Sequence, residues 1–387
     1  MATKKLIYLD YSAATPLDGQ ALEAMKPYFA DKFYNPSSTY SSSKEVKLAV
    51  DQARKTVAEI LGAKKSEIIF TAGGTEANNL AIIGLAAKFK SGAFVATDIE
   101  HESVLEPLEY IKRRGGKVNL VKPDKTGIVK VEDILSKITD KTVLVSVIYA
   151  NNEIGTIQPI STIGQKLARI RRERKKRGVK MPLYFHSDAA QAVNYLDTHT
   201  SRLGVDLMSI NSGKIYGPKQ CGALFVKGGV ELSPLIFGGG QEHGLRSGTQ
   251  NVPYIIGFAA ALQKTANLRK AESARLKKLQ NLFIGEIEKN ISKVKINGSL
   301  KRRLPNNVHL TFEGIDNEEL LIRLDEAGIQ AASGSACNAS SDEPSHVLRA
   351  IGLSDEQARS SIRFSLGRQT TGDDIIQTVK TLKNLLN

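Results

Sequence analysis

The chain has 387 residues, of which 41% are hydrophobic, so it is long enough to form more than one domain with a buried core. It contains no apolar run of about 18 residues or more and opens without a signal peptide, which predicts a soluble cytoplasmic protein without a membrane span. A formal net charge of +14 predicts partners of opposite charge.

The two cysteines indicate neither a disulfide framework nor a metal site. Cys221 and Cys337 are far apart in the sequence and lack the spacing of metal ligands. Cys221 opens an apolar strand and is expected in the core. Cys337 lies in residues 332–344, ASGSACNASSDEP, whose composition predicts a loop. A thiol on an exposed loop can act as a reagent, and an incidental surface cysteine is the alternative.

The N-terminal part of the chain is predicted to contain one strand and two helices. Apolar residues 6–9 form the strand, and the polar residues 10–16 form a turn. Residues 21–30 and 43–61 have helical periodicity, and Pro36 requires a loop between them.

From residue 67 onwards, short apolar strands alternate with amphipathic helices. Strands are predicted over residues 67–71, 93–97, 117–121, 142–148, 181–188 and 205–210, and helices begin near residues 75, 104, 131 and 163. This alternation predicts an α/β fold with a largely parallel sheet and helices on both of its faces. Ligands of such sheets bind beyond the carboxyl ends of the strands.

Three of these strand ends carry groups that pyridoxal phosphate requires. Lys214 follows one strand on a tight turn and supplies an amine for a Schiff base, and Asp188 ends another and supplies an acid for the ring nitrogen. Gly73 and Gly74 lead into a helix whose N-terminal amides can bind a phosphate. Alone, such a lysine is usually a solvated charge and such a glycine turn is common. Together, the three features indicate a pyridoxal phosphate enzyme.

The sequence changes character after residue 235. A glycine-rich loop is followed by a long lysine-rich helix over residues 255–289. Strands are then predicted over residues 308–312 and 361–365, with a last helix from Asp373. The predicted division is a large cofactor-binding domain of residues 15–255 and a smaller domain of residues 1–14 and 256–387 that carries the Cys337 loop.

A basic run, RIRRERKKR, occupies residues 169–177 near the end of a predicted helix. Such a run is usually a solvated face, and cations near a helix C-terminus also favour the helix dipole. A docking patch for an acidic protein or tRNA is the alternative. Nothing resembles a known nucleic-acid-binding motif, so direct binding of nucleic acid is not expected.

An ordered set of motifs resembles the cysteine desulfurases, pyridoxal phosphate enzymes of the class V aminotransferase superfamily. The motifs are YLDYSAATP, NPSS, EIIFTAGGTEANNLAI, EHESVLEP, VSVIYANNEIGTIQPI, HSDAAQAV, KIYGPKQCGALFV, LRSGTQN, SGSACNASSDEPSHVLRAIG and SSIRFSLGR. They extend over essentially the whole chain. The long cysteine segment further resembles the first of two desulfurase groups, which serves iron–sulfur assembly and tRNA thiolation. The resemblance implies a fold-type I transferase, with a mainly parallel large domain and a smaller α+β C-terminal domain.

The resemblance also implies a role for individual residues. Cys337 would be the nucleophile, Lys214 would bind the cofactor and move the α-proton, and His101 would stack on the ring. The cofactor-binding residues would be Gly74, Thr75, His101, Asn152, Asp188, Gln191, Lys214 and, from a second subunit, Thr249. Asn35 and Arg363 would bind the substrate carboxylate.

These roles imply conversion of L-cysteine to L-alanine with a persulfide on Cys337. They also imply a homodimer and a sulfur acceptor such as an iron–sulfur scaffold or a tRNA-thiolation factor.

One motif departs from the family pattern. The usual Ser-x-His-Lys reads Asn211, Ser212, Gly213 and Lys214, so a histidine donor to the phosphate is lost, and Asn211 or Ser212 could supply a hydrogen bond. Two alternatives therefore stay open. One is a selenocysteine lyase or another β-elimination enzyme of the same superfamily. The other is a weakly active sulfur-relay scaffold that no longer binds the cofactor tightly. A nicotinamide enzyme fits worse, because no G-x-G-x-x-G follows the first strands.

Overall fold

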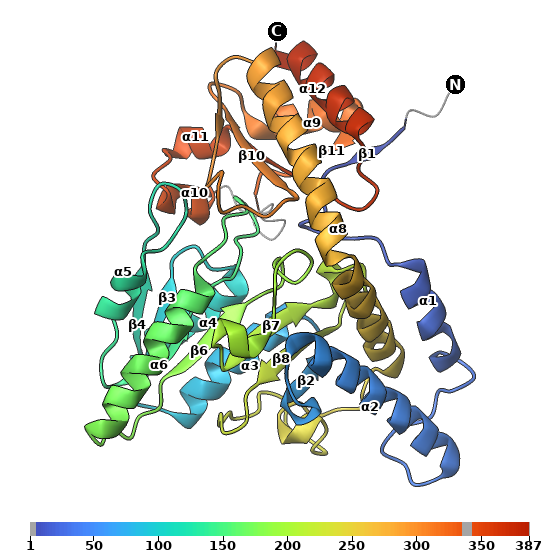
Figure 1. Ribbon diagram of the computed structural model, residues 1–387, viewed down its shortest axis with the longest axis vertical. Helices are drawn as coiled ribbons and strands as arrows, with labels where there is room; N and C mark the ends of the chain where they lie inside the picture. The colour runs from blue at the N-terminus through green and yellow to red at the C-terminus, as the bar shows by residue number, and fades with distance from the viewer. Residues whose placement is uncertain (1–4, 335–342, 387) are drawn as a thin grey trace.

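The computed structural model describes residues 5–334 and 343–386, so the predicted nucleophile Cys337 lies outside the described residues. Figure 1 shows one body that contains the large sheet and a second body around the smaller sheets, with helix α8 (Val252–Asn290) running through both. None of the described helices, even α8 with its 39 residues, is apolar over enough of its length to cross a bilayer.

The large sheet has seven strands in the order β2-β8-β7-β6-β5-β3-β4. The strands are β2 (Ile68–Thr71), β3 (Ala93–Thr97), β4 (Lys117–Val121), β5 (Thr142–Ser146), β6 (Tyr184–Asp188), β7 (Leu207–Asn211) and β8 (Gly222–Val226). Strands β4, β3, β5, β6 and β7 run parallel, whereas β8 is antiparallel to both β7 and β2. The largely parallel sheet is therefore confirmed. Strand β8 reverses because residues 212–221, which contain the short η3 turn (Ser212–Lys214) and no α-helix, connect it to β7.

Helices cover both faces of this sheet, as the strand and helix alternation predicts. The helices of the large body are α2 (Ser41–Leu61), α3 (Gly74–Lys88), α4 (Glu102–Arg113), α5 (Val131–Ser136), α6 (Ile160–Lys176) and α7 (Thr200–Leu203). Buried residues of α2, α6 and α8 form one core with the sheet, and those of α3 and α4 form another. Because side chains alternate along a strand, the neighbours Phe94 and Val95 belong to different cores.

The N-terminal helix differs from the prediction at its end. The predicted helix over residues 21–30 is α1 (Gly19–Met25) followed by a 3₁₀ turn, η1 (Lys26–Tyr28). Pro27 has no N–H group to continue an α-helical hydrogen-bond ladder, so the α-helix ends before it.

The second body has its own sheets and a core of its own. Its elements are β1 (Ile7–Tyr8), β9 (Val294–Ile296), β10 (Asn307–Phe312), α9 (Asn317–Glu326), β11 (Ile329–Gln330), α10 (His346–Ala350), α11 (Asp355–Arg359), β12 (Ser361–Ser365) and α12 (Gly372–Leu386). The buried residues of α10 and α11, however, belong to the first core. Strands β12, β10 and β9 form an antiparallel sheet, and β1 pairs with β11. Ile255 and Leu262 of α8 lie in the first core and Phe283 in the second, so one helix belongs to both bodies. The division of the chain at residue 255 stays a prediction.

Part of the basic run on α6 binds the large body itself. The buried Arg174 donates to the carbonyl oxygen of Thr142 at 2.9 Å. Arg177 donates from both Nη atoms to Asp140 at 2.7 Å, and Arg171 pairs with Asp206. These contacts favour an intramolecular role for three arginines of the run over a docking patch.

A buried ion pair fixes the loop that precedes α8. Arg54 of α2 and Glu242 of the η4 turn (Glu242–Gly244) are 6% and 5% exposed, and two hydrogen bonds of 2.6 and 2.7 Å join them. Glu242 also accepts from the amide of Phe70 in β2, at 2.8 Å. The loop therefore docks on α2 and β2 through one carboxylate.

We expect Arg54→Met to lower the free energy of unfolding by about 3–5 kcal/mol, because it leaves the Glu242 carboxylate buried without its partner. Chemical denaturation measures this change. The matched control is Lys55→Met on the same helix, whose partner Glu59 lies at 3.8 Å on the surface. The control should cost less than about 1 kcal/mol. Equal losses in the two variants would contradict the prediction.

Candidate active site

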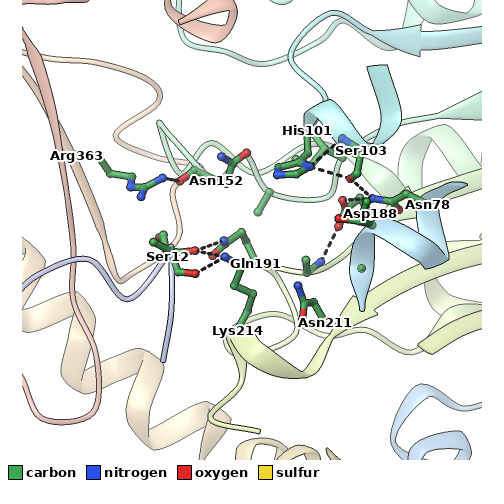
Figure 2. Close-up of a pocket in the computed structure, with 16 residues that line it drawn as sticks. Ser12, Asn78, His101, Ser103, Asn152, Asp188, Gln191, Asn211, Lys214 and Arg363 are labelled. Atoms are coloured by element: carbon green, nitrogen blue, oxygen red, sulfur yellow. Dashed lines mark hydrogen bonds between the residues drawn. The ribbon is translucent and has the colours of Figure 1, made fainter. Parts of the chain in front are cut away.

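A pocket opens where strands of the large sheet end, and Figure 2 shows the side chains around it. Its lining residues are Ser12, Ala13, Gly74, Thr75, Asn78, His101, Ser103, Ile148, Ala150, Asn152, Asp188, Ala190, Gln191, Asn211, Lys214 and Arg363. Asp188 and Asn211 are the last residues of β6 and β7. Arg363 comes from β12 of the second body, so both bodies contribute to the pocket.

The Lys214 amine is held against the N-terminal segment of the chain. Its Nζ donates to the carbonyl oxygens of Ser12 at 2.9 Å and Ala13 at 2.5 Å. Thr15 binds the turn on both sides of Lys214. Its Oγ1 donates to the Gly213 carbonyl at 3.1 Å and accepts from the Tyr216 amide at 2.8 Å. Gln191 also donates to the Ser12 carbonyl, at 2.9 Å. The position of the Lys214 amine thus depends on contacts with a segment near Ser12, 202 residues earlier in the chain.

The Asp188 carboxylate lies on the opposite side of the pocket from Arg363 (Figure 2) and is only 6% exposed. Its Oδ2 accepts from Asn78 Nδ2 at 2.7 Å, and its Oδ1 accepts from the Ala190 amide at 2.9 Å. The same Asn78 nitrogen donates to Ser103 Oγ at 2.8 Å. Among the described residues, nothing donates to Asn78 Oδ1, which is buried.

His101 stands at the N-cap of α4, with its ring beside Ser103 (Figure 2). The backbone amide of Ser103 donates to Nδ1 at 3.0 Å, and Ser103 Oγ lies 2.8 Å from the same atom. Because Nδ1 accepts, a neutral ring carries its proton on Nε2. The capping bond therefore fixes both the orientation and the tautomer of the ring.

The N-terminus of α3, where the sequence predicts a phosphate cradle, lies at the pocket. Gly73 has φ of 145°, in a region that favours glycine, and Gly74 and Thr75 then begin the helix. Asn211 lies beside this turn, since a Cβ added at Gly74 would be 3.3 Å from Asn211 Cβ. Asn211 Oδ1 accepts from the Gly213 amide at 3.0 Å, which leaves its Nδ2 as the group that can donate to a ligand.

Ser212 has a different environment from Asn211. Its Oγ is buried and would be 2.2 Å from a Cβ added at Gly217, so the hydroxyl faces the protein interior. Ser212 does not line the pocket, whereas Asn211 does. Of the two residues that the sequence leaves open as a replacement donor, the structure therefore favours Asn211.

Arg363 is 1% exposed and is held from two sides. Its Nη2 forms an ion pair with Asp10 at 2.6 Å, and its Nη1 donates to the carbonyl oxygen of Asn152 at 3.1 Å. Within the described part of the chain, no acceptor binds its buried Nε. A guanidinium with an unsatisfied donor in a pocket is suited to a carboxylate ligand.

The structure brings together most of the predicted site residues, but not all of them. Asn35 is exposed, accepts from the Ser37 amide at 2.9 Å and does not line the pocket. Thr249 is exposed on the loop before α8 and also lies outside the pocket of its own chain. Cys337 is outside the described residues. The roles of these three residues stay predictions.

Sequence reasoning missed the groups that orient the predicted residues. Asn78 and Ser103 contact Asp188 and His101, and the carbonyls of Ser12 and Ala13 contact Lys214. The only available signal was proximity, because Asn78 follows the glycine turn by one helical turn and Ser103 follows His101 by two residues.

Two buried ionisable groups lie close to Asp188. Burial, with a smaller effect from the charge of Asp188, raises the pKa of Glu100 to about 8. Its Oε1 accepts from the Ile148 amide at 2.7 Å and from the hydroxyl of Thr97. Burial lowers the pKa of His186 to about 4, and its ring lies between the hydroxyls of Ser146 and Ser209. Both groups are therefore predominantly uncharged at neutral pH.

The chain is similar to known proteins over its whole length. The family model described as Aminotransferase class-V matches residues 7–377. The protein named cysteine desulfurase IscS from Dictyoglomus turgidum is 42% identical over 385 residues, covering 99% of this chain and 95% of that protein. The protein of the same name from Clostridium botulinum is 44% identical over 386 residues, covering 99% and 94%. A solved structure named NifS-like protein has a TM-score of 0.90 at 33% identity and covers 99% of each chain, which confirms the predicted fold class.

We expect Glu100→Gln to flatten the pH dependence of the free energy of unfolding between pH 4.5 and about 8. The pKa of Glu100 rises from an ordinary 4.5 to about 8 on folding, so the native state retains a proton that the unfolded state releases. The wild type therefore loses stability as pH rises from 4.5 to 8, by at most about 1.4 kcal/mol per pH unit from this group, and the glutamine variant does not.

Urea denaturation at pH 5, 7 and 9 measures the difference between the two proteins, which should grow in favour of Glu100→Gln as pH rises. Glu106→Gln, on the exposed face of α4, serves as the control and should leave the difference constant. Parallel curves for Glu100→Gln and the wild type would show that Glu100 is ionised in the folded protein.

Proposed function

The chain belongs to the aminotransferase class V family, and we propose that it is a pyridoxal phosphate-dependent cysteine desulfurase that transfers the sulfur of L-cysteine to Cys337. The observation that carries this proposal is the meeting of Lys214, Asp188 and Arg363 in one pocket. The amine of Lys214 can bond to the cofactor aldehyde, and the acid of Asp188 can pair with the ring nitrogen. The buried guanidinium of Arg363 can bind the carboxylate of an amino acid. The full-length similarity to proteins named cysteine desulfurase supports the same substrate.

The pocket residues fit pyridoxal phosphate. The first amides of α3, with Thr75 and Asn211 Nδ2, form a donor set for the phosphate. Asp188 would hold the ring nitrogen, His101 would cover the ring face, and the orphaned Asn78 Oδ1 leaves an acceptor near Asp188. When bound, pyridoxal phosphate supplies an aldehyde for covalent attachment and a ring that withdraws electrons from the substrate.

The chain's own residues position the substrate and move its protons. Arg363 binds the carboxylate of L-cysteine, with Asn152 and Asp10 fixing the guanidinium. Lys214 is the last residue of η3, and its amine accepts the α-proton of the substrate and returns a proton to carbon. Gln191 and Asn152 line the pocket and would contact the polar groups of the bound cofactor.

Cys337 would receive the sulfur. Its thiolate attacks the sulfur of the bound substrate, so that an S–S bond forms while the Cβ–S bond breaks, and the electron pair of the broken bond stays with carbon. The carbon then takes up a proton. The net reaction converts L-cysteine and one protein thiol into L-alanine and one protein persulfide, which balances without an added oxidant.

The proposal includes a homodimer and an acceptor. Thr249 would complete the phosphate site of a second subunit, and its exposed position on a loop anchored by Glu242 and Arg246 supports this. The acceptor would be an iron–sulfur scaffold or a tRNA-thiolation factor, and the net charge of +14 favours an acidic protein surface. The cytoplasm is the expected compartment.

The absorption spectrum of the purified protein tests the enzyme proposal. We expect a visible band from the covalently bound cofactor that changes when L-cysteine is added, and we expect Lys214→Ala to lack both the band and alanine formation. Cys337→Ala should keep the band and lose persulfide and alanine formation at least about 100-fold. A colourless wild type after reconstitution would support the scaffold alternative. Alanine formation that survives Cys337→Ala would support the β-elimination alternative.

We expect Asn211→Ala to raise the Kd for pyridoxal phosphate about 10- to 100-fold, because it removes a hydrogen bond to a charged group. Equilibrium dialysis of the reconstituted protein measures this without an activity assay. Asn211→Ser restores a short donor and should recover most of the affinity. Ser212→Ala should leave the Kd unchanged, because this hydroxyl faces the interior. A wild-type Kd for Asn211→Ala would remove Asn211 from the phosphate site.

A further inference from the structure

Helix α3 buries one polar side chain, that of Asn78. Along the whole of this described helix, the other buried residues are glycine, alanine, leucine or isoleucine. Asn78 is 1% exposed, and the burial of an amide costs free energy unless its polar atoms form hydrogen bonds. The partners of this amide therefore explain why a polar residue occupies an otherwise apolar position.

The Asn78 amide divides its two hydrogens between two neighbours. Its Nδ2 lies 2.7 Å from Asp188 Oδ2 and 2.8 Å from Ser103 Oγ. An ionised carboxylate can only accept, so the atom that faces Asp188 is the nitrogen of the amide and not its oxygen. One hydrogen then points to Asp188 and the other to Ser103, whose hydroxyl oxygen accepts it.

The Ser103 hydroxyl continues this chain of hydrogen bonds to His101 (Figure 2). Ser103 Oγ lies 2.8 Å from His101 Nδ1, and the Ser103 backbone amide donates to the same ring atom at 3.0 Å. Because Nδ1 accepts from the amide, the hydroxyl hydrogen also points to Nδ1. A carboxylate that only accepts and a backbone amide that only donates stand at the two ends of the chain, and both require the same arrangement of protons.

The chain connects three elements that meet at the pocket. Asp188 ends β6, and Asn78 lies one turn into α3. Ser103 is the second residue of α4 and follows the N-cap residue His101 by two positions. Asp188 and Ser103 are only 6% and 7% exposed, so water competes little for these bonds. One buried amide therefore orients the residue proposed for the cofactor ring nitrogen and, through a hydroxyl, the residue proposed for the ring face.

We propose that Asn78 is a positioning residue for the cofactor ring, which it serves by orienting Asp188 directly and His101 through Ser103. This inference rests on the proposed function. Asn78 acts through two residues, whereas Ser103 acts through His101 alone. Loss of Asn78 should therefore weaken cofactor binding more than loss of Ser103 does, and only the effect of Ser103 should disappear when the His101 ring is absent.

The measurement is the Kd for pyridoxal phosphate, determined by equilibrium dialysis of the full-length protein without enzymatic turnover. For Asn78→Ala we expect the Kd to rise about 10- to 100-fold, because a hydrogen bond to a charged group is lost. For Ser103→Ala we expect a rise of about 3- to 10-fold, because only bonds between neutral groups are lost.

Variants made in a His101→Ala background separate the two routes. In this background, Ser103→Ala should change the Kd less than about twofold, because the hydroxyl has no ring to orient. Asn78→Ala should still raise the Kd at least about fivefold, because its bond to Asp188 does not depend on the ring.

Two conservative variants separate hydrogen bonding from packing. Asn78→Asp keeps the size of the side chain but places an acceptor beside the Asp188 carboxylate, so it should raise the Kd at least as much as Asn78→Ala. Ser103→Thr keeps the hydroxyl and should restore a Kd within about threefold of wild type, because the chain to His101 is retained.

Asn297→Ala is the matched control, because it removes another buried amide that binds a histidine and a hydroxyl. Asn297 Nδ2 lies 3.0 Å from His309 Nδ1 and donates to Thr311 Oγ1 at 2.7 Å, and none of the three residues lines the pocket. This variant should leave the Kd for pyridoxal phosphate at the wild-type value.

Three outcomes would overturn the inference. They are an Asn78→Ala Kd within twofold of wild type, an equal loss in Asn297→Ala, and a Ser103→Ala effect that persists undiminished in the His101→Ala background. If Asn78→Ala does not fold, the Ser103 and His101 variants alone decide. Failure of the proposed function looks different, because the wild type itself would then bind no pyridoxal phosphate, and the inference would fall with it.

Discussion

The buried ion pair between Arg363 and Asp10 is the contact on which the site depends most. It joins strand β12 to the N-terminal segment, and the second hydrogen bond of Arg363 joins both to the turn after β5. An arginine that is 1% exposed requires such partners, because an unpaired buried charge costs several kcal/mol. The pair therefore links the position of the proposed carboxylate-binding group to the contact between the N-terminal segment and strand β12. The N-terminal segment that supplies Asp10 also supplies the carbonyls that hold Lys214, so one segment serves both ends of the pocket.

The sequence predicted the strands around this site, and the residues at their ends, better than the contacts between side chains. Strands such as β3 and β4 have the predicted bounds, because short apolar runs between polar turns carry a local signal. Lys214, Asp188 and Gly74 could be placed at strand ends by the same reasoning. Asn78 could not be assigned to Asp188, since 110 residues separate the two and only the strand order of the folded sheet brings them together. Residues 329–330 show the same limit, because strand β11 exists only through its pairing with β1.

The local structure does not require a glycine at position 213. A Cβ there would meet Asn211 Oδ1 at 3.6 Å and Lys219 Cγ at 3.7 Å, which are ordinary contacts, so a side chain at this position is sterically allowed. The glycine is therefore not required by backbone crowding. Asn211 instead uses its oxygen to cap η3 and points its amide nitrogen to the same side as the first turn of α3. Asn211, which replaces the usual serine, thus offers a hydrogen-bond donor where the histidine donor is missing. This argues against a sulfur-relay scaffold that no longer binds the cofactor tightly.

The electrostatics around Asp188 follow from which of its neighbours are charged. Glu100 keeps its proton because burial and the charge of Asp188 raise its pKa, and His186 stays neutral because burial lowers its pKa. The hydrogen bonds to the Asp188 carboxylate come from neutral amides, those of Asn78 and Ala190. A carboxylate solvated by neutral donors in a buried pocket attracts a cation strongly, because the local dielectric constant is low. A protonated ring nitrogen of the bound cofactor would supply that cation.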